Sequence, residues 1–305
     1  MRVAVTGAFG YSGRYITEEL LAAGHNVITL TNSLGRTNPF GERVTAHPFH
    51  FDQPDELANS LEGVEVLVNT YWVRFDHKLF THQEAVSNTK VLFRAAKKAG
   101  VRRIVHVSIT NPDVHSDLPY FRGKAELEEA LTSLGVSYCI LRPTVLFGKE
   151  DVLINNIAWA LRHLPVFGVF GDGSYKLQPI YVGDLAKSAV AQAGGGLNEI
   201  VNAIGPETFT YHELVEMVKR TLGVRRLVIG VPPDLGYLAC RAMGLAVGDV
   251  VITRQEIAGL TEGRLFVAAP PLGTTNLTEW VERNKRTLGR RYTSEMARRV
   301  DRHSP

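Results

Sequence analysis

A glycine-rich turn near the N-terminus constrains the fold of this chain more than any other feature. The β-branched run Arg2–Thr6 leads into the turn, and an apolar helical pattern follows it. Gly7 permits backbone angles that a side chain forbids, Gly10 lets the main chain approach a pyrophosphate, and Gly13 lets the helix pack close to the strand. The free N–H groups at the start of the helix attract phosphates. The pattern therefore predicts a dinucleotide-binding turn.

Strand-like and helix-like segments alternate through the first half of the chain. The expected strands are Arg2–Thr6, Asn26–Leu30, Val44–Phe49, Val64–Asn69, Arg103–Ser108 and Val136–Leu141. The expected helices are Tyr11–Ala23, Phe75–Ala99 and Pro119–Ser133. Such alternation predicts an α/β fold with a Rossmann-type, doubly wound parallel sheet. The strands are continuously apolar because helices bury both faces of the sheet.

The rhythm changes after Pro143 and indicates a second region. We expect residues 1–148 to form the dinucleotide-binding domain, and 149–177 with 205–305 to form a smaller, mainly helical lobe for substrate or partner. Residues 178–204 are expected to return to the first domain. Their expected elements are a strand over Gln178–Val182, a helix from Leu185 that Asp184 caps, and a strand over Glu199–Ala203.

The end of the second strand bears on the choice of cofactor. A carboxylate there would hold the ribose 2′-hydroxyl of NAD and repel a 2′-phosphate. The chain instead carries Thr31 and Asn32, with Arg36 and Arg14 as candidate phosphate ligands. These residues favour NADP(H) over NAD(H). Asp52, after the third strand, either binds the adenine amino group or caps the helix that begins near Pro54.

Composition excludes several classes of protein. The 305 residues are 45% hydrophobic, and a net charge of +3 is too weak to indicate nucleic acid binding. The two cysteines are far apart, and neither they nor the histidines have metal-site spacing, so we expect no metal and a reducing, cytoplasmic location. We find no secretory signal or membrane-spanning run. The apolar stretch 235–251 indicates a packing helix or lid, with membrane contact as the alternative.

The C-terminal segment 280–302 is basic. Its cations are Arg283, Lys285, Arg286, Arg290, Arg291, Arg298, Arg299 and Arg302. Acidic residues are interspersed among them, which is typical of a solvated helical face. The alternative is that this tail docks to an acidic protein partner or to an anionic membrane surface.

Several motifs together resemble those of a known superfamily. The run Thr6–Gly13, with Tyr120-Phe121-Arg122-Gly123-Lys124 downstream, resembles the short-chain dehydrogenase/reductases. Leu141–Gly148 resembles the extended and atypical branch, which includes NAD-dependent epimerases and dehydratases. Gln178–Asp184 and Gly205–Tyr211 support a likeness to the NAD(P)-binding accessory subunits of respiratory complex I and their bacterial relatives.

The resemblance implies roles for particular side chains. Tyr120 would exchange a proton with the substrate, Lys124 would lower the tyrosine pKa and hold the nicotinamide ribose, and Thr110, or alternatively Ser108, would polarise a carbonyl. The cofactor-binding candidates are Gly7, Phe9, Gly10, Tyr11, Ser12, Gly13, Arg14, Thr31, Asn32, Arg36, Asp52, Asn69, Tyr71, Ser108, Lys124 and Pro143. Tyr71 and Trp72 either form a wall of the pocket or are core aromatics.

Two functions follow from these residues. The first is an NAD(P)-dependent oxidoreductase or epimerase/dehydratase-like enzyme that acts on a small molecule and uses the Tyr/Lys pair for proton transfer. The alternative is a non-catalytic NADP(H)-binding module, or a redox sensor, within a larger assembly.

Overall fold

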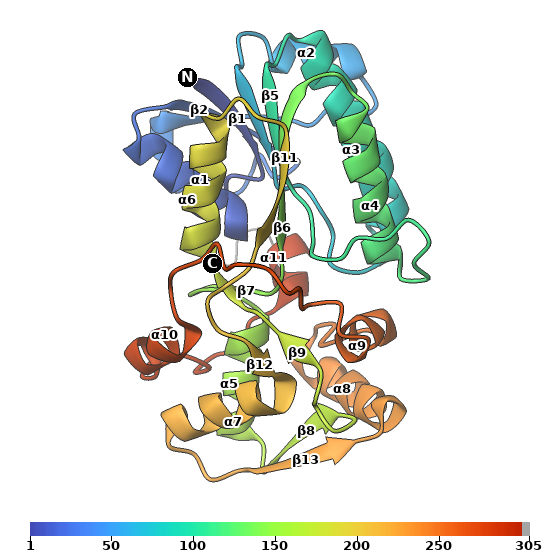
Figure 1. Cartoon of the computed structure of the whole chain (residues 1–305), viewed down its shortest axis with the longest axis vertical. Coiled ribbons are helices and arrows are strands. Elements are labelled where there is room, and N and C mark those ends of the chain that lie inside the picture. The colour runs from blue at the N-terminus through green and yellow to red at the C-terminus, as the bar shows by residue number, and fades with distance from the viewer. Residues whose placement is uncertain (301–305) are drawn as a thin grey trace. The chain divides into compact units, whose positions relative to one another are not determined.

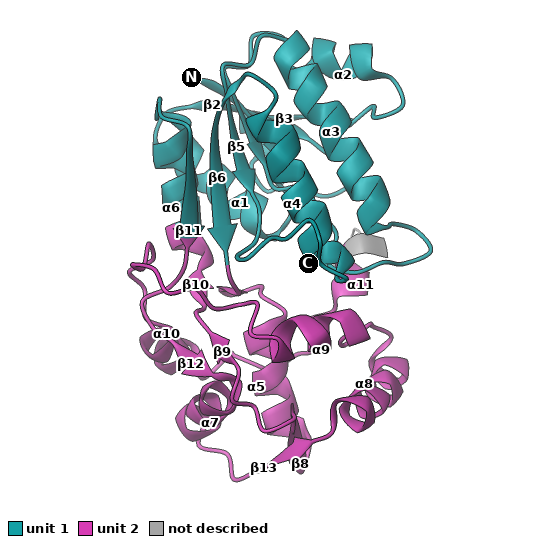
Figure 2. Ribbon diagram, turned by 45° about the vertical axis from the view of Figure 1, so that its right-hand side comes forward, with its two compact units in different colours: residues 1–143, 185–202 teal, residues 144–184, 203–305 magenta. Residues whose placement is uncertain are grey.

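The chain divides into two compact units (Figure 2). The computed structural model describes residues 1–300, with side chains as far as Arg298. Unit 1 comprises residues 1–143 and 185–202, and unit 2 comprises 144–184 and the chain from 203 onward. The first break falls at Pro143, where the sequence suggested 148. The reason is that β7 (Leu146–Phe147) does not continue the large sheet but pairs with β10 (Ile180–Tyr181) of unit 2.

A seven-stranded sheet forms the centre of unit 1. Its strands are β1 (Arg2–Thr6), β2 (Asn26–Leu30), β3 (Val44–His47), β4 (Val66–Asn69), β5 (Arg103–Val107), β6 (Ser137–Pro143) and β11 (Glu199–Ala203). Their order is β11-β6-β5-β4-β1-β2-β3, and every pair from β6 to β3 is parallel. The predicted Rossmann-type sheet is therefore confirmed. The strand order reverses between β1 and β4, and ligands of such sheets bind beyond the carboxyl ends at that point.

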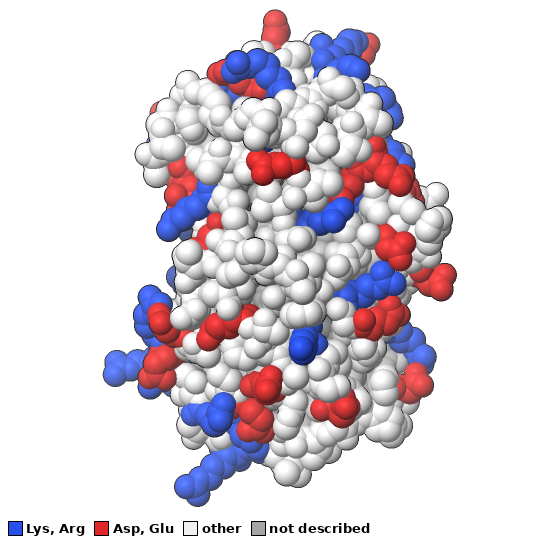
Figure 3. All heavy atoms as spheres, in the orientation of Figure 1, with Lys and Arg blue, Asp and Glu red and all other residues white. Residues whose placement is uncertain are grey.

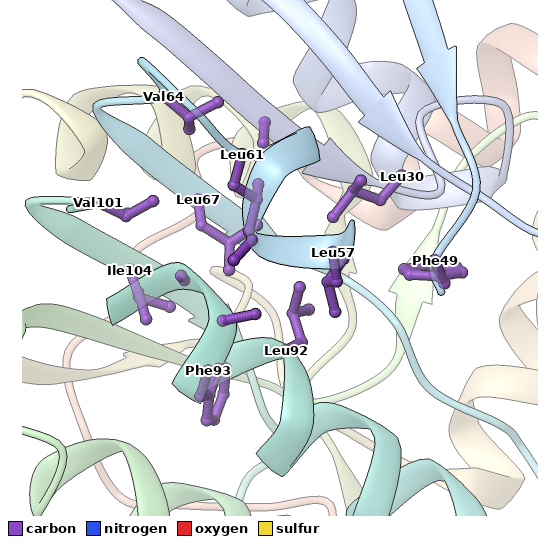
Figure 4. Packing of buried hydrophobic residues seen from close by; sticks show 14 of the residues in the cluster. Leu30, Phe49, Leu57, Leu61, Val64, Leu67, Leu92, Phe93, Val101 and Ile104 are labelled. Atoms are coloured by element: carbon purple, nitrogen blue, oxygen red, sulfur yellow. The ribbon is translucent and has the colours of Figure 1, made fainter. Parts of the chain in front are cut away.

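Helices cover both faces of this sheet (Figure 1). The helix α1 (Tyr11–Ala22) and most of α6 (Val182–Ala193) lie on one face, and α2 (Pro54–Ser60), α3 (His82–Lys98) and α4 (Pro119–Thr132) lie on the other. Figure 4 shows how the second face packs: Leu57 of α2, Leu61 at the end of that helix and Leu92 of α3 cluster with the sheet residues Leu67 and Ile104. This apolar burial is the main force that holds the helices on the sheet.

The start of α3 differs from the prediction. The sequence pattern placed it at Phe75, but the helix begins at His82. The Thr81 hydroxyl accepts a hydrogen bond from the backbone N–H of Glu84, and the Glu84 carboxylate accepts one from the N–H of Thr81. This capping box fixes the first turn. The preceding residues form a tight loop instead, in which the backbones of His77 and Phe80 hydrogen-bond to each other.

Unit 2 is mainly helical, as predicted. Its helices are α5 (Leu153–His163), α7 (Tyr211–Leu222), α8 (Pro233–Val247), α9 (Arg254–Thr261), α10 (Leu277–Asn284) and α11 (Glu295–Val300). Two further strand pairs join β8 (Val166–Phe170) to β13 (Leu227–Val231) and β9 (Lys176–Leu177) to β12 (Phe209–Thr210). The core of unit 2 is built around buried Phe147, Leu161, Leu214 and Val281. The expected strand 178–182 is shorter than predicted and is limited to β10.

Asp184 does not cap a helix, contrary to the prediction. The helix α6 begins at Val182, so Asp184 lies inside its first turn. The Asp184 carboxylate accepts hydrogen bonds from the backbone N–H groups of Thr274 and Thr275 and from the Thr275 hydroxyl. Its role in unit 2 is to hold the segment that leads into α10.

The helix α8 has an unusually apolar exposed face. Leu235, Leu238 and Leu245 are 61%, 53% and 85% exposed. Their spacing places them on one side of the helix, because residues three, four and seven positions apart share a face. The opposite side packs, since Gly236 and Gly244 are buried. Among residues 1–300, no helix has both the length and the apolar character needed to cross a bilayer.

The basic C-terminal segment pairs many of its charges. Arg283 contacts Glu279 at 3.1 Å, Lys285 contacts Glu282, and Arg298 donates to the carbonyl of Glu150. On the face drawn in Figure 3, cations and anions are interspersed. The side chain of Arg299 and the whole of Arg302, which the sequence analysis included in this tail, lie outside the described part of the chain.

Candidate functional site

The glycine turn closes tightly between β1 and α1. Gly7 has a φ of 67°, in the left-handed region that glycine tolerates. Its N–H donates to the carbonyl of Leu30, and the N–H of Gly10 donates back to the carbonyl of Gly7 at 2.8 Å. A Cβ on Gly13 would lie 2.3 Å from the Gly7 carbonyl oxygen, so only glycine fits there. The turn and the helix are therefore in direct backbone contact.

The first turn of α1 suits an anion. Gly10 caps the helix without a side-chain hydrogen bond, and no acidic residue lies in the first turn. The backbone N–H groups of a helix start, together with the helix dipole, attract phosphate. Phe9 is buried beneath the turn, while Tyr11 and Ser12 are partly exposed. This cradle fits the pyrophosphate of a dinucleotide.

The second strand ends among hydroxyl, amide and guanidinium groups. The buried Thr31 accepts a hydrogen bond from the N–H of Ser33, which bends the chain into the loop that carries Arg36. Asn32 is exposed, and no carboxylate lies between Thr31 and Arg36. Arg14 forms an exposed pair with Glu18 at 3.0 Å along α1. These residues present polar and positive groups near the end of β2 but no competing acid.

Asp52 is exposed and does not cap α2. The N-cap of α2 is Gln53, without a side-chain hydrogen bond, and Pro54 opens the helix. The capping alternative for Asp52 is therefore wrong. The carboxylate stays available to solvent or to a ligand beyond β3.

A buried polar chain joins the carboxyl ends of β1, β4 and β5. The Thr6 hydroxyl donates to the Asn69 side-chain oxygen at 3.0 Å, and the Asn69 amide lies 3.0 Å from Nδ1 of His106. The N–H groups of Thr70 and Tyr71 donate to the Thr6 hydroxyl. Asn69 is fully buried, so its side chain takes part in this hydrogen-bond network and is not exposed at the surface. The network fixes the strand ends beside the glycine turn.

Tyr120 and Lys124 share one face of α4 against Trp72. The ring of Tyr120 lies 5.6 Å from the Trp72 ring, edge to face, and Nζ of Lys124 lies 4.4 Å from the Trp72 ring centre. Gly123 makes room for this packing, because a Cβ there would be 2.9 Å from the indole. His82 of α3 completes the aromatic group at 5.8 Å from Tyr120. Both side chains therefore contact Trp72 from the same helix.

Lys124 is buried, with 2% of its surface exposed. Its ammonium donates to the carbonyl of Val107 at 2.7 Å. Burial lowers the pKa of Lys124 to about 7, and the carboxylate of Glu128 opposes that shift. Burial, followed by the charge of Lys124, also holds the pKa of His106 well below its usual range. Burial therefore disfavours the charged form of both side chains, and Glu128 partly offsets this effect at Lys124.

The two candidate hydroxyls are engaged inside unit 1. Thr110 is fully buried, and its hydroxyl donates to the backbone carbonyls of Arg142 and Pro143. Ser108 is buried and donates to Glu128 at 2.5 Å. Neither hydroxyl points freely at a substrate in this arrangement. Pro143 is buried, and its carbonyl also accepts from the N–H of Thr110.

Tyr71 packs as a core aromatic while keeping part of its surface exposed. Its ring lies 5.0 Å from Phe49 and 5.2 Å from Phe51, and its hydroxyl accepts a hydrogen bond from Asn88. Trp72 packs against the same cluster. Of the two roles left open for Tyr71 and Trp72, packing is therefore evident.

Sequence reasoning missed three residues beneath the Tyr/Lys face: His106, Glu128 and Arg142. Glu128 follows Lys124 by four residues, and this spacing places both on one side of a helix. This four-residue spacing could have pointed to Glu128 from the sequence alone. The partnership of Glu128 with Arg142 of β6 could not be predicted in this way, because it joins elements brought together only by the sheet. Among the described residues, no group of three His, Cys, Asp or Glu side chains has the placement of a metal site.

Residues 7–156 match a family model described as NAD(P)H-binding. Over this range the chain is similar to NAD(P)H-binding domains. The matched range includes the glycine turn, Asn69 and His106 of the polar chain behind it and the Tyr120/Lys124 face. It ends shortly after the boundary of unit 1 at Pro143.

Proteins similar to this NAD(P)H-binding chain include two mitochondrial respiratory subunits. The chain is 28% identical over 227 residues to NADH dehydrogenase (ubiquinone) 1 alpha subcomplex subunit 9 of Arabidopsis thaliana, covering 70% of this chain and 56% of that protein. It is 27% identical over 268 residues to the NADH-ubiquinone oxidoreductase 40 kDa subunit of Neurospora crassa, covering 83% and 68%. The chain thus spans little more than half the length of the Arabidopsis protein.

A solved reductase has a similar fold. The Citrobacter sp. triphenylmethane reductase complexed with NADP(H) superposes with a TM-score of 0.76 at 19% identity, covering 93% of this chain and 99% of that one. At this identity the likeness concerns the fold alone.

Substituting Gly13 with alanine tests the close contact between the turn and α1. The added methyl group would meet the backbone carbonyl of Gly7. Overpacking against backbone costs about 1–3 kcal/mol, so we expect the Gly13→Ala variant to lose about that much stability and to bind NADPH weakly. Chemical denaturation and a fluorescence titration with NADPH measure the two effects.

The matched control is Gly35→Ala, since a Cβ on Gly35 would meet no atom within 4 Å and its φ is not in the left-handed region. Its stability should stay within about 0.5 kcal/mol of the wild type. Equal stability of the Gly13→Ala variant and the wild type would contradict the contact.

Proposed function

We propose that this protein is an NADP(H)-dependent reductase in which Tyr120 passes a proton to the substrate. One observation carries the proposal: Tyr120 and Lys124 lie together against Trp72, on the helix that follows β5. The carboxyl ends of the strands are where sheets of this kind hold ligands. A phenol, a cation four residues away and a dinucleotide cradle form the set needed for reduction of a carbonyl or a related acceptor.

Each side chain has a separate part in this reaction. The bound cofactor supplies the hydride. The Tyr120 hydroxyl donates a proton to the substrate oxygen on which negative charge develops, and the nearby Lys124 ammonium stabilises the resulting phenolate. Trp72 and His82 border the ring of the phenol. Thr110 and Pro143 hold the chain beyond β5 and β6 in place through their mutual hydrogen bonds.

Several features support NADP(H) over NAD(H). The loop after β2 carries Arg36 and no carboxylate, and the cofactor of the similar triphenylmethane reductase is NADP(H). A guanidinium can hold a 2′-phosphate through paired, charge-assisted hydrogen bonds. Asn32 and Thr31 provide further polar groups at the strand end, and Asp52 lies beyond the neighbouring strand β3.

The Arg36→Gln variant tests the phosphate contact. We expect the Kd for NADPH to rise about tenfold, which corresponds to about 1.4 kcal/mol, while the Kd for NADH stays unchanged. The exposed Arg43, also in the segment between β2 and β3, supplies the matched control Arg43→Gln. Equal losses for both cofactors in Arg36→Gln, or a similar loss in Arg43→Gln, would contradict the assignment. Isothermal titration calorimetry measures all four constants.

The Tyr120→Phe variant tests the proton donor. It should bind NADPH as the wild type does but reduce a quinone, aldehyde or ketone identified by screening about 10²–10⁴-fold more slowly, because a proton donor is lost. Stopped-flow oxidation of NADPH gives the rate. Tyr138→Phe, on β6, is the control and should keep full activity. Unchanged turnover in Tyr120→Phe would remove this residue from the mechanism.

A second candidate is a cofactor-holding module or redox sensor within a larger assembly. The exposed leucine face of α8 favours it, since single chains rarely expose three neighbouring leucines without a partner. The respiratory subunits named above are parts of an assembly, which agrees with a protein partner at this face. Arg241, on α8, is also exposed and would suit an acidic partner.

Cofactor exchange distinguishes the two candidates. A reductase must release oxidised cofactor on the timescale of turnover, whereas a structural ligand stays bound. Exchange of bound NADPH for added NADP⁺ within seconds, with turnover of a screened acceptor, would support the reductase. A nucleotide that remains through purification and does not exchange over hours would support the module. The two free cysteines, Cys139 and Cys240, suit a reducing compartment for either function.

A further inference from the structure

Glu128 is the best-anchored carboxylate in unit 1. Glu128 is buried. Nε of Arg142, on β6, donates to both carboxylate oxygens, at 3.0 and 3.1 Å. A terminal guanidinium nitrogen of Arg142 donates to one of these oxygens at 2.5 Å. Ser108, just beyond β5, donates its hydroxyl to the same carboxylate. A buried carboxylate needs such partners, because an unpaired one would be strongly destabilised. Three elements therefore converge on this one side chain.

The same carboxylate lies one helical turn from the proposed active-site lysine. Residues four apart on a helix are neighbours on its surface. The close contacts of the Lys124 ammonium are the Val107 carbonyl and the Trp72 ring. A carbonyl and an aromatic face stabilise a cation only partly when it is removed from water. A fixed negative charge nearby is what this buried ammonium requires.

We propose that Glu128 is a positioning residue: held by Arg142 and Ser108, its carboxylate keeps the ammonium of Lys124 charged and directed at the carboxyl end of β5. The inference extends the proposed function, because that reaction needs a cationic Lys124 beside Tyr120. Glu128 itself touches neither substrate nor cofactor.

The other groups that face Lys124 do not supply this charge. His106 on β5 is buried and neutral, and its own pKa is depressed by burial and by Lys124. Tyr120, on the same helix, is separated from the ammonium by one turn and is neutral until it gives up its proton. His82 of α3 lies across the Trp72 ring and pairs with Asp76. Glu128 is thus the anion whose interaction raises the pKa of Lys124 against the effect of burial.

The titration of Lys124 tests this proposal directly. The protein is labelled with ¹³C-lysine, and the ¹³Cε resonance of Lys124 is assigned by its absence in Lys124→Met. This resonance should titrate with a midpoint near the Lys124 pKa of about 7. We expect the midpoint to fall by at least about one pH unit in Glu128→Gln, because an opposite charge close to a site shifts its pKa by about 1–3 units. The alkaline limit of the pH–rate profile should move downward by the same amount.

The direction in which the Lys124 midpoint shifts distinguishes a positioning role of Glu128 from a general loosening of the packing around it. If Glu128→Gln merely loosened the packing, water would reach Lys124 and the midpoint would rise toward the ordinary lysine value. Glu126→Gln is the matched control, since Glu126 is on the same helix but pairs with Lys90 near the surface. It should leave the midpoint unchanged. A rise, or no change, in Glu128→Gln would overturn the proposal.

A second variant keeps the test decisive if Glu128→Gln does not fold. Glu128→Asp keeps a negative charge at this position, so the midpoint of Lys124 should stay within about half a pH unit of that of the wild type. A fall of about a full pH unit or more in Glu128→Asp would contradict the proposal. These titrations use protein without cofactor or substrate. A failed Tyr120→Phe test would therefore leave their outcome unaffected, and the two failures can be told apart.

Discussion

The contact between Gly13 and the carbonyl of Gly7 determines the rest of the site. With no side chain at Gly13, α1 begins against the turn that leaves β1, and its first turn carries no side-chain cap. Two hydrogen bonds fix the turn to the sheet: the N–H of Ala8 donates to the Thr29 hydroxyl, and that hydroxyl donates to the Val5 carbonyl. Cofactor binding follows from this backbone geometry, because the phosphates of a dinucleotide need N–H groups that are already in place.

Behind the turn, Thr6 and Asn69 pair internally, whereas Nε2 of His106 has no hydrogen-bond partner among the described residues. The chain from Thr6 through Asn69 to His106 leads from the glycine turn toward Lys124. One helical turn beyond Lys124, the Glu128 carboxylate pairs with Arg142 and accepts a hydrogen bond from Ser108. Paired polar groups of this kind make a buried site more rigid. Tyr120, the proposed proton donor, therefore lies on α4, which the ion pair between Glu128 and Arg142 joins to β6. The Tyr120 ring itself contacts Trp72 and His82.

The sequence was most informative where local chemistry decides structure. The parallel sheet followed from β-branched runs that alternate with helical patterns, and the turn followed from three glycines. The start of α3 was misplaced because the Thr81-x-x-Glu84 capping box, a local signal for a helix start, was overlooked. Asp184 was misread for a different reason: its partners Thr274 and Thr275 lie 90 and 91 residues away. A one-dimensional pattern cannot show such partners.

Candidate site residues show the same limit. Ser108, Thr110 and Asn69 stand at strand ends, where ligands of this fold bind, yet each side chain bonds to the protein interior. Residue type and position predict that a hydroxyl is near the site but not the direction in which it donates. Tyr120 and Lys124 were proposed because their motif resembles that of the short-chain dehydrogenase/reductases, and its four-residue spacing lies within one helix. Arg142 was missed because only the pairing of β5 with β6 brings it to Glu128.

Hydrogen–deuterium exchange with and without NADPH tests the central claim, that the glycine turn and the start of α1 hold the cofactor phosphates. The first N–H groups of a helix have no acceptor within the helix itself, so bound phosphates should protect them. We therefore expect the backbone amides of residues 11–13 to become strongly protected when NADPH binds, while exchange in α8 stays unchanged. Unaltered exchange over residues 11–13 at saturating NADPH would contradict a phosphate site at this turn.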